Sequence, residues 1–184
     1  MQPLLTEFAA LFVYGPALVV LHELGHALFA RLGGYRVTSF GIGLGTPLIR
    51  MRLSGPMVVH LDRWWLAGGA CIAIPDGPPT TRRIWFHGGG LLLQGVLALV
   101  LLVLPSHWLV DRVAQFNLLV ALTNIVPWRL GANASDGWYI LDALNGGRFA
   151  GNPLSQRAQF EQMADREHAN DSPLGLAYGD LCVT

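Results

Sequence analysis

Residues His22-Glu23-Leu24-Gly25-His26 form a His-Glu-x-x-His pattern inside an apolar stretch of the chain. Residues four positions apart lie on one face of a helix, so His22 and His26 can offer imidazole nitrogens to one Zn²⁺ ion. Glu23 would then point toward a water molecule on that ion and act as general base. The pattern predicts a zinc hydrolase site and supplies two of its three protein ligands.

Two readings without catalysis remain open for these residues. The histidines and the glutamate could only hydrogen-bond within a helical bundle, although ionisable groups inside a membrane are costly and a purely structural trio would be expensive. The chain could also be a non-catalytic membrane protein that binds a client or a metal. Glu23 argues against the second reading, because binding zinc requires no general base at that position.

The composition is that of a membrane protein. Of 184 residues, 52% are hydrophobic and only 13% are charged, which is unusual for a soluble domain. The formal net charge is zero, so no basic surface indicates a nucleic-acid partner. The two cysteines, Cys71 and Cys182, are far apart and match no metal-ligand spacing, so we expect free thiols.

Three segments are predicted to span the bilayer, at residues 8–30, 88–105 and 113–128. The third is more polar than the others and is expected to pack inward; its polar side chains are Gln115, Asn117 and Asn124. Most arginines fall between the first two spans or after the third, and short loops rich in arginine stay in the cytoplasm. We therefore expect an integral, multi-pass protein of a bacterial cytoplasmic membrane, with its carboxyl terminus in the cytoplasm.

The loop between the first two spans is predicted to be β-rich over residues 35–75. Apolar and polar residues alternate on both sides of Ser54-Gly55-Pro56, which indicates a hairpin over residues 49–61. Residues 68–74 could form one more strand, and His60 is expected to face solvent. The predicted fold class is a mainly α membrane protein, with a core of three transmembrane helices and a small β insertion on the cytoplasmic side.

The chain is predicted to divide into a core, residues 1–148, and a polar cytoplasmic tail, residues 149–184. A short helix should run from Trp138 to Leu144 and stop at Gly146-Gly147, and residues 155–168 of the tail could form an exposed helix.

Further motifs follow the third span: Asn124-Ile125-Val126-Pro127 and then, after a short insert, Ser135-Asp136-Gly137. Together with His-Glu-x-x-His and the glycine-rich segment 40–45, they resemble the site-2 protease family of intramembrane zinc metalloproteases (peptidase family M50). The usual family pattern has four fewer residues between the Pro and the Asp. Many members also carry an Asn where this chain has Gln94.

The resemblance implies that His22, His26 and Asp136 bind zinc, that Glu23 is the general base, and that Asn124 supports the site or polarises the scissile carbonyl. The implied function is a zinc-dependent intramembrane endopeptidase, which cleaves a transmembrane segment of a membrane protein by metal-activated water. Its implied partners are a single-span helical substrate and the lipid bilayer, and no nucleic acid. Chemically, two imidazoles, a carboxylate and a water complete a tetrahedral zinc site.

Alternatives exist for individual residues. Asp136 precedes a helical run and could simply be its N-cap. Glu161-x-x-x-Asp165 resembles the third-ligand motif of membrane gluzincins, in which case Glu161 would bind the metal. For the substrate, we hypothesise that it unwinds and adds as a strand to the edge of the hairpin around Ile49 to Leu61.

Overall fold

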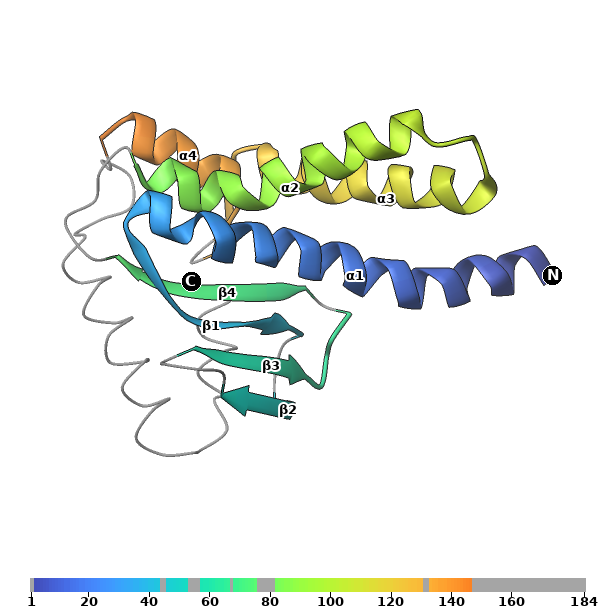
Figure 1. Ribbon diagram of the computed structural model, residues 1–184, viewed down its shortest axis with the longest axis horizontal. Helices are drawn as coiled ribbons and strands as arrows, with labels where there is room; N and C mark the ends of the chain where they lie inside the picture. The colour runs from blue at the N-terminus through green and yellow to red at the C-terminus, as the bar shows by residue number, and fades with distance from the viewer. Residues whose placement is uncertain are drawn as a thin grey trace.

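The computed structural model describes residues 2–43, 46–52, 57–66, 68–75, 82–130 and 133–146. The elements in chain order are α1 (Gln2–Gly33), β1 (Tyr35–Ile42), β2 (Pro47–Arg52), β3 (Val58–Asp62), β4 (Gly69–Pro75), α2 (Arg83–Val103), α3 (Trp108–Ile125), β5 (Arg129–Leu130), β6 (Asn133–Ala134) and α4 (Asp136–Leu144). The described part is therefore mainly helical with a small sheet. Helix α1 lies in the middle, with α2, α3 and α4 on one side of it and the sheet on the other (Figure 1).

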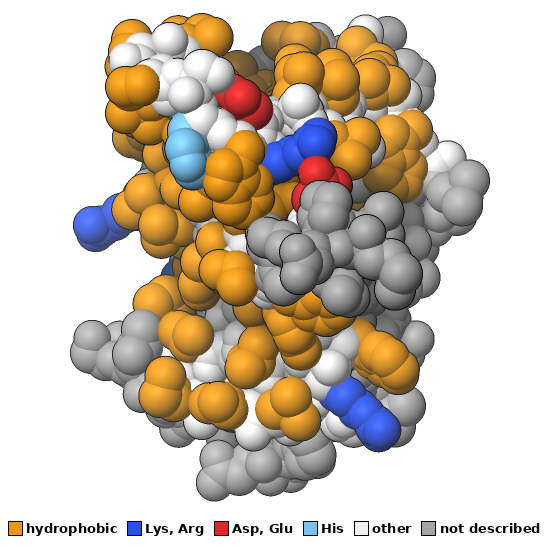
Figure 2. All heavy atoms as spheres, turned by 90° about the vertical axis from the view of Figure 1, so that its right-hand side faces the viewer, with side chains coloured by type: hydrophobic (Ala, Val, Ile, Leu, Met, Phe, Trp, Pro, Cys, Tyr) orange, Lys and Arg blue, Asp and Glu red, His pale blue; other side chains and the backbone are white. Residues whose placement is uncertain are grey.

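Two helices are long and apolar enough to cross a membrane, through Leu11–Gly33 of α1 and Arg83–Val103 of α2. Only 39% and 22% of these stretches are buried, so much of their apolar surface faces outward, unlike that of a core helix in a soluble protein. Figure 2 shows hydrophobic side chains over much of the described surface at the end where α1 begins and α2 turns into α3. Helix α3 forms where the third span was expected but is less apolar, so its crossing stays a prediction.

Helices α1 and α2 cross at glycines, which lets their backbones touch. A Cβ added to Gly89 would overlap the carbonyl group of Gly25, and one added to Gly25 would lie 2.7 Å from the Cα of Gly90. A Cβ on Gly90 would lie 2.5 Å from the ring of His22. This close approach brings α2 directly against the motif histidines.

The main sheet has the strand order β2-β3-β1-β4. Strands β2 and β3 pair antiparallel, which confirms the predicted hairpin, and β4 confirms the additional strand. β1 pairs parallel with β3 and antiparallel with β4. The two edges of the sheet are therefore β2, far from α1, and β4, beside it (Figure 1).

The sheet lies alongside the apolar stretch of α1 (Figure 1). A Cβ on Gly69 of β4 would lie 2.7 Å from the side chain of Val19. The ring of Trp65, in the turn before β4, contacts the ring of Phe12 at a centroid distance of 5.9 Å. The sheet thus accompanies α1 over much of its length.

The prediction that His60 faces solvent was wrong. His60 and Asp62 are buried in β3, where Nδ1 of His60 lies 3.1 Å from Oδ1 of Asp62, while Ile49 and Met51 of β2 are exposed. A sheet with one face in water turns its polar residues outward, and the prediction assumed that arrangement. Here the polar residues of β3 turn inward and large apolar residues of β2 face outward.

Among the described residues between Pro127 and Ser135, strands β5 and β6 pair antiparallel, with Arg129 opposite Ala134. Ser135 joins the two ends of this segment. Its N–H donates to the carbonyl of Trp128 at 3.0 Å, and its Oγ donates to the carbonyl of Val126 at 2.7 Å. The end of α3 and the start of α4 therefore stay close together despite the longer sequence between them.

Helix α4 confirms the predicted short helix. Its N-cap is Ser135, whose Oγ accepts from the N–H of Trp138, so the N-cap reading of Asp136 is wrong and its carboxylate is available for another role. Gly146, with φ of 73°, follows the end of α4, as the glycine stop predicted. The predicted tail, the helix over residues 155–168, Glu161 and Cys182 lie outside the described residues.

Candidate metal centre

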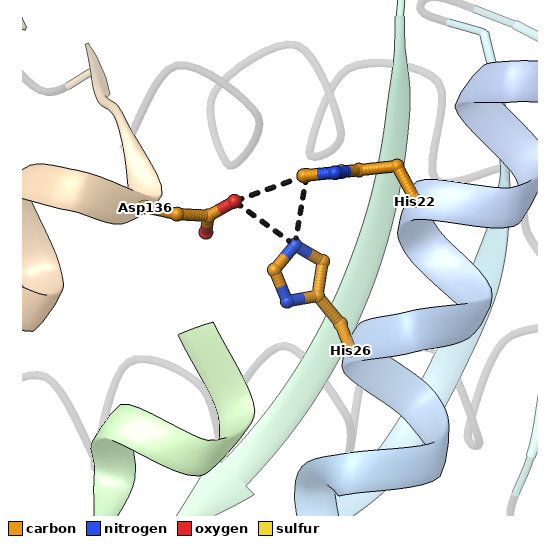
Figure 3. A group of neighbouring side chains, drawn as sticks. All are labelled: His22, His26 and Asp136. Atoms are coloured by element: carbon orange, nitrogen blue, oxygen red, sulfur yellow. Dashed lines mark hydrogen bonds and ion pairs between the residues drawn. The ribbon is translucent and has the colours of Figure 1, made fainter. Parts of the chain in front are cut away.

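Side chains from α1 and α4 converge at one point. His22 and His26, one helical turn apart on α1, face Asp136 in the first turn of α4 (Figure 3). The Nε2 atoms of the two histidines are 3.1 Å apart, and they lie 3.0 Å (His22) and 3.3 Å (His26) from Oδ2 of Asp136. The three residues are only 5%, 6% and 9% exposed, so bulk water does not stabilise this arrangement.

Hydrogen bonds on the far side of each imidazole fix its protonation. Nδ1 of His22 lies 3.1 Å from Oε1 of Gln94, and Nδ1 of His26 lies 2.7 Å from the backbone oxygen of Phe86. Carbonyl oxygens only accept, so both Nδ1 atoms carry a hydrogen and donate it. In the neutral rings, both Nε2 atoms therefore direct lone pairs toward Asp136.

This donor set fits a zinc ion. Ligand atoms about 2.0–2.1 Å from a tetrahedral ion lie about 3.3–3.4 Å from one another, close to the separations of the three atoms here. Among the described residues, Oδ2 of Asp136 is buried and receives no hydrogen bond. Three acceptor atoms that face one another in a buried site form an arrangement that a cation between them would satisfy. The three residues leave one position of a tetrahedral ion for water or substrate.

The Asp136 carboxyl is held in its ionised form. Burial alone would raise the pKa of this carboxyl. In the metal-free protein a proton on His26, and the nearby imidazoles of His22 and His87, outweigh burial and hold the pKa well below its usual range. Asp136 can therefore act as an anionic ligand without first losing a proton.

Glu23 lies next to the three converging residues, on the side of α1 that faces the sheet. Its buried carboxylate accepts a hydrogen bond from the backbone N–H of Cys71 in β4. A Cβ on Gly69 would lie 2.7 Å from Cγ of Glu23, so a glycine is required where β4 passes this side chain. A carboxylate beside the converging ligands, and outside their triangle, has the placement of a general base.

The side chain of Asn124, expected to support the site, hydrogen-bonds within its own helix. Its Nδ2 donates to the carbonyl of Val120 in its own helix at 2.9 Å, and among the described residues no hydrogen bond joins it to His22, His26 or Asp136. Its backbone oxygen instead lies 3.2 Å from where a Cβ of Gly137 would stand, so this segment packs closely against the start of α4.

Sequence reasoning missed two residues of α2 that contact the ligands. Gln94 accepts from His22, and Nδ1 of His87 lies 3.7 Å from Oδ1 of Asp136. The sequence does single out Gln94, because it is the only polar side chain in the apolar segment 88–105. Nothing in the local sequence of His87 indicates Asp136 as its neighbour.

Cys71 has a free thiol, as predicted. Burial, followed by the nearby carboxylates of Glu23 and Asp136, raises the pKa of this thiol well above its usual value. The thiolate is the form of cysteine that binds metals, so Cys71 lies near the centre without the charge state of a ligand.

Two histidines on one helix, a glutamate beside the first and a carboxylate from a second helix define a candidate site of the zinc peptidase class. The chain belongs to peptidase family M50, whose model matches residues 8–109. This match confirms the predicted family. It covers His22, Glu23 and His26 and ends before α4, so the position of Asp136 is an independent result of the geometry.

One curated relative, from Synechocystis sp., is named "Putative zinc metalloprotease". It is 36% identical to this chain over 80 residues, which are 42% of this chain and 21% of the relative. The matched region thus spans about a fifth of that relative's length.

Proposed function

We propose that this protein is a zinc-dependent intramembrane endopeptidase. His22, His26 and Asp136 would hold the ion, and the observation that carries the proposal is the convergence of their three acceptor atoms at 3.0–3.3 Å. A bound zinc ion would supply Lewis-acid activation of water at this site. Membership of family M50 and the name of the relative both support a zinc peptidase.

The membrane part of the proposal follows from where the ligands lie. His22 and His26 belong to the apolar stretch Leu11–Gly33, which is long enough to span a bilayer. A peptide bond in a transmembrane helix already has its carbonyl hydrogen-bonded, so a substrate must unwind before water attacks it. The substrate we propose is a membrane protein with a single spanning helix that unwinds beside α1.

Glu23 would take the proton of the attacking water. Its carboxylate is fixed by the N–H of Cys71 and by the fit against Gly69, so it is held in place without a contact to the ligand atoms of the histidines. The same carboxyl can return the proton to the leaving amine, which completes a peptide hydrolysis.

We further propose that the substrate adds to the other edge of the sheet, β4, rather than to the β2–β3 hairpin hypothesised from the sequence. β3 and β1 lie between β2 and β4. β4 pairs with β1 on one side only, and the N–H of Cys71 that reaches Glu23 points to its other side. An unwound substrate added along that side of β4 would lie next to Glu23 and the converging ligands.

The test compares bound zinc and cleavage in purified and co-expressed protein. We expect wild type and Glu23→Gln to retain about one zinc ion per chain, while only wild type processes a co-expressed single-span membrane protein. Asp136→Ala should lose most of its zinc. Equal processing by wild type and Glu23→Gln would favour a non-catalytic binding protein.

The gluzincin alternative predicts a different pattern of zinc loss. If Glu161 were the third ligand, Glu161→Gln would lose zinc and Asp136→Ala would keep it. The contact of Asp136 with both histidines supports the opposite result.

A further inference from the structure

His87 lies against the oxygen of Asp136 that does not face the histidines. Its Nδ1 is 3.7 Å from Oδ1 of Asp136, whereas Oδ2 of the same carboxylate faces His22 and His26. The side chain of His87 is 13% exposed. A separation of 3.7 Å is an ion-pair distance, and a shift of about half an ångström makes it a hydrogen bond.

Aromatic rings hold the His87 imidazole in this position. It stacks on Tyr139, with ring centroids 4.5 Å apart and an angle of 11° between the planes. The edges of Phe86 and Tyr35 approach it at 4.9 Å and 6.3 Å. Tyr139 is three residues after Asp136 on α4, so one helix positions both the carboxylate and the ring that faces it.

Its place on α2 links His87 to the histidines as well. The preceding residue, Phe86, is the one whose backbone oxygen accepts from His26. Two consecutive residues of α2 therefore contact two of the three converging side chains, from the side opposite to their ligand atoms. Such outer contacts fix the orientation of metal ligands.

We propose that His87 is a positioning residue for the metal centre: its Nδ1–H restrains Oδ1 of Asp136 and so keeps Oδ2 directed at the ion. The inference rests on the proposed function, because it presupposes a metal held by His22, His26 and Asp136. Without this donor the buried carboxylate can rotate, and the ligand geometry becomes less well defined. Loss of an outer contact of this kind typically weakens metal binding by about 10–100-fold.

The experiment uses Co²⁺ as the probe, in the full-length protein purified in detergent. His87→Phe keeps a flat ring that can stack on Tyr139 but cannot donate. His87→Asn keeps a donor near the position of Nδ1. Affinity is measured by competition with a chelator, and the visible Co²⁺ spectrum reports the ligand geometry independently of activity.

We expect His87→Phe to bind Co²⁺ about 10–100-fold more weakly and to change its spectrum, and His87→Asn to stay within about threefold of wild type. Thermal unfolding of the metal-free proteins shows whether each variant is folded. If His87→Phe does not fold, His87→Asn becomes the test. Co²⁺ binding by His87→Asn as weak as that by Asp136→Ala would then overturn the inference.

The two proposals fail in different ways. If wild type binds Co²⁺ in a manner that depends on Asp136, and folded His87→Phe binds it equally well with an unchanged spectrum, the role of His87 is overturned and the proposed function stands. If wild type and Asp136→Ala bind Co²⁺ alike, both are overturned.

Discussion

At the scale of residues, the centre depends on acceptors that fix the two imidazoles. His26 is held by a backbone oxygen, which no substitution removes, whereas His22 is held by the side chain of Gln94. Gln94 is completely buried, and among the described residues its Nε2 has no hydrogen-bond partner. A buried amide whose two N–H donors are both unused indicates that its acceptor is what this position requires.

Replacing Gln94 should therefore change metal affinity through His22. We expect Gln94→Leu, which removes the acceptor at similar size, to weaken zinc binding by about 10–100-fold. Gln94→Glu keeps an acceptor and should bind zinc nearly as wild type does. Competition with a chelator gives the affinities, and equal binding by the leucine variant would show that the contact does not orient His22.

The sequence predicted the ligand set because the chemistry lies in short motifs. His22, Glu23 and His26 are adjacent in the chain, and Asp136 was found only through its resemblance to a family motif. Gln94 and His87 act through contacts that join positions 22 with 94 and 136 with 87, and no local pattern encodes such pairs. Asn124 is the reverse case, since its motif was recognised but its side chain is engaged by its own helix.

At the scale of elements, the crossing of α1 and α2 sets the distance between the ligand helix and the residues that orient it. Gly89 of α2 faces the carbonyl of Gly25, while a Cβ on its neighbour Gly88 would meet nothing within 4 Å. The two glycines thus offer the same substitution in two environments on one helix.

Gly89→Ala should force the helices apart and destabilise the protein by about 1–3 kcal/mol, as overpacking does. Gly88→Ala should be neutral or stabilise it by up to about 1 kcal/mol, because alanine favours the helix. Thermal unfolding in detergent measures both. Equal effects of the two variants would contradict the close crossing.

The proposed substrate edge is also tested at this scale. Proline removes a backbone donor, and an edge strand tolerates it where that donor points away from the sheet. Among variants that fold, proline at one of Ile72, Ala73 or Ile74 in β4 should abolish cleavage of a single-span substrate, and proline along β2 should not. Cleavage that survives every folded β4 variant would remove β4 as the receiving edge.

The strands were predictable and their environment was not. Alternation of residue types indicated β2, β3 and β4, yet the same alternation was assigned to the wrong faces, as His60 shows. Period alone states which residues share a face of a strand. Which face turns outward depends on what packs against the sheet. The packing of α1 against β4 is a contact between distant segments, and the alternation within one strand does not encode it.

At the scale of the whole molecule, the centre joins parts that are distant in the chain. α1 supplies two converging side chains and α4 the third, and α4 is also tied to α2 by a buried ion pair between Arg83 and Asp142. The hairpin β5–β6 allows this arrangement despite the longer sequence between Pro127 and Ser135. The sequence shows how many residues are inserted, but it did not predict that β5 and β6 pair with each other.

Because the ion would bridge α1 and α4 only in the folded protein, zinc should stabilise the fold by mass action. At a free zinc concentration about 100 times the dissociation constant, this linkage amounts to about 2.7 kcal/mol. We expect a chelator to lower the unfolding temperature of wild type and of Glu23→Gln equally, since Glu23 is not a ligand. Asp136→Ala should unfold at nearly the same temperature with and without the chelator. A chelator shift of the same size in Asp136→Ala would mean that the stabilising ion binds elsewhere.

The ion pair of Arg83 with Asp142 does not depend on the metal. α4 should therefore stay docked in the metal-free protein, and unfolding should remain one cooperative transition.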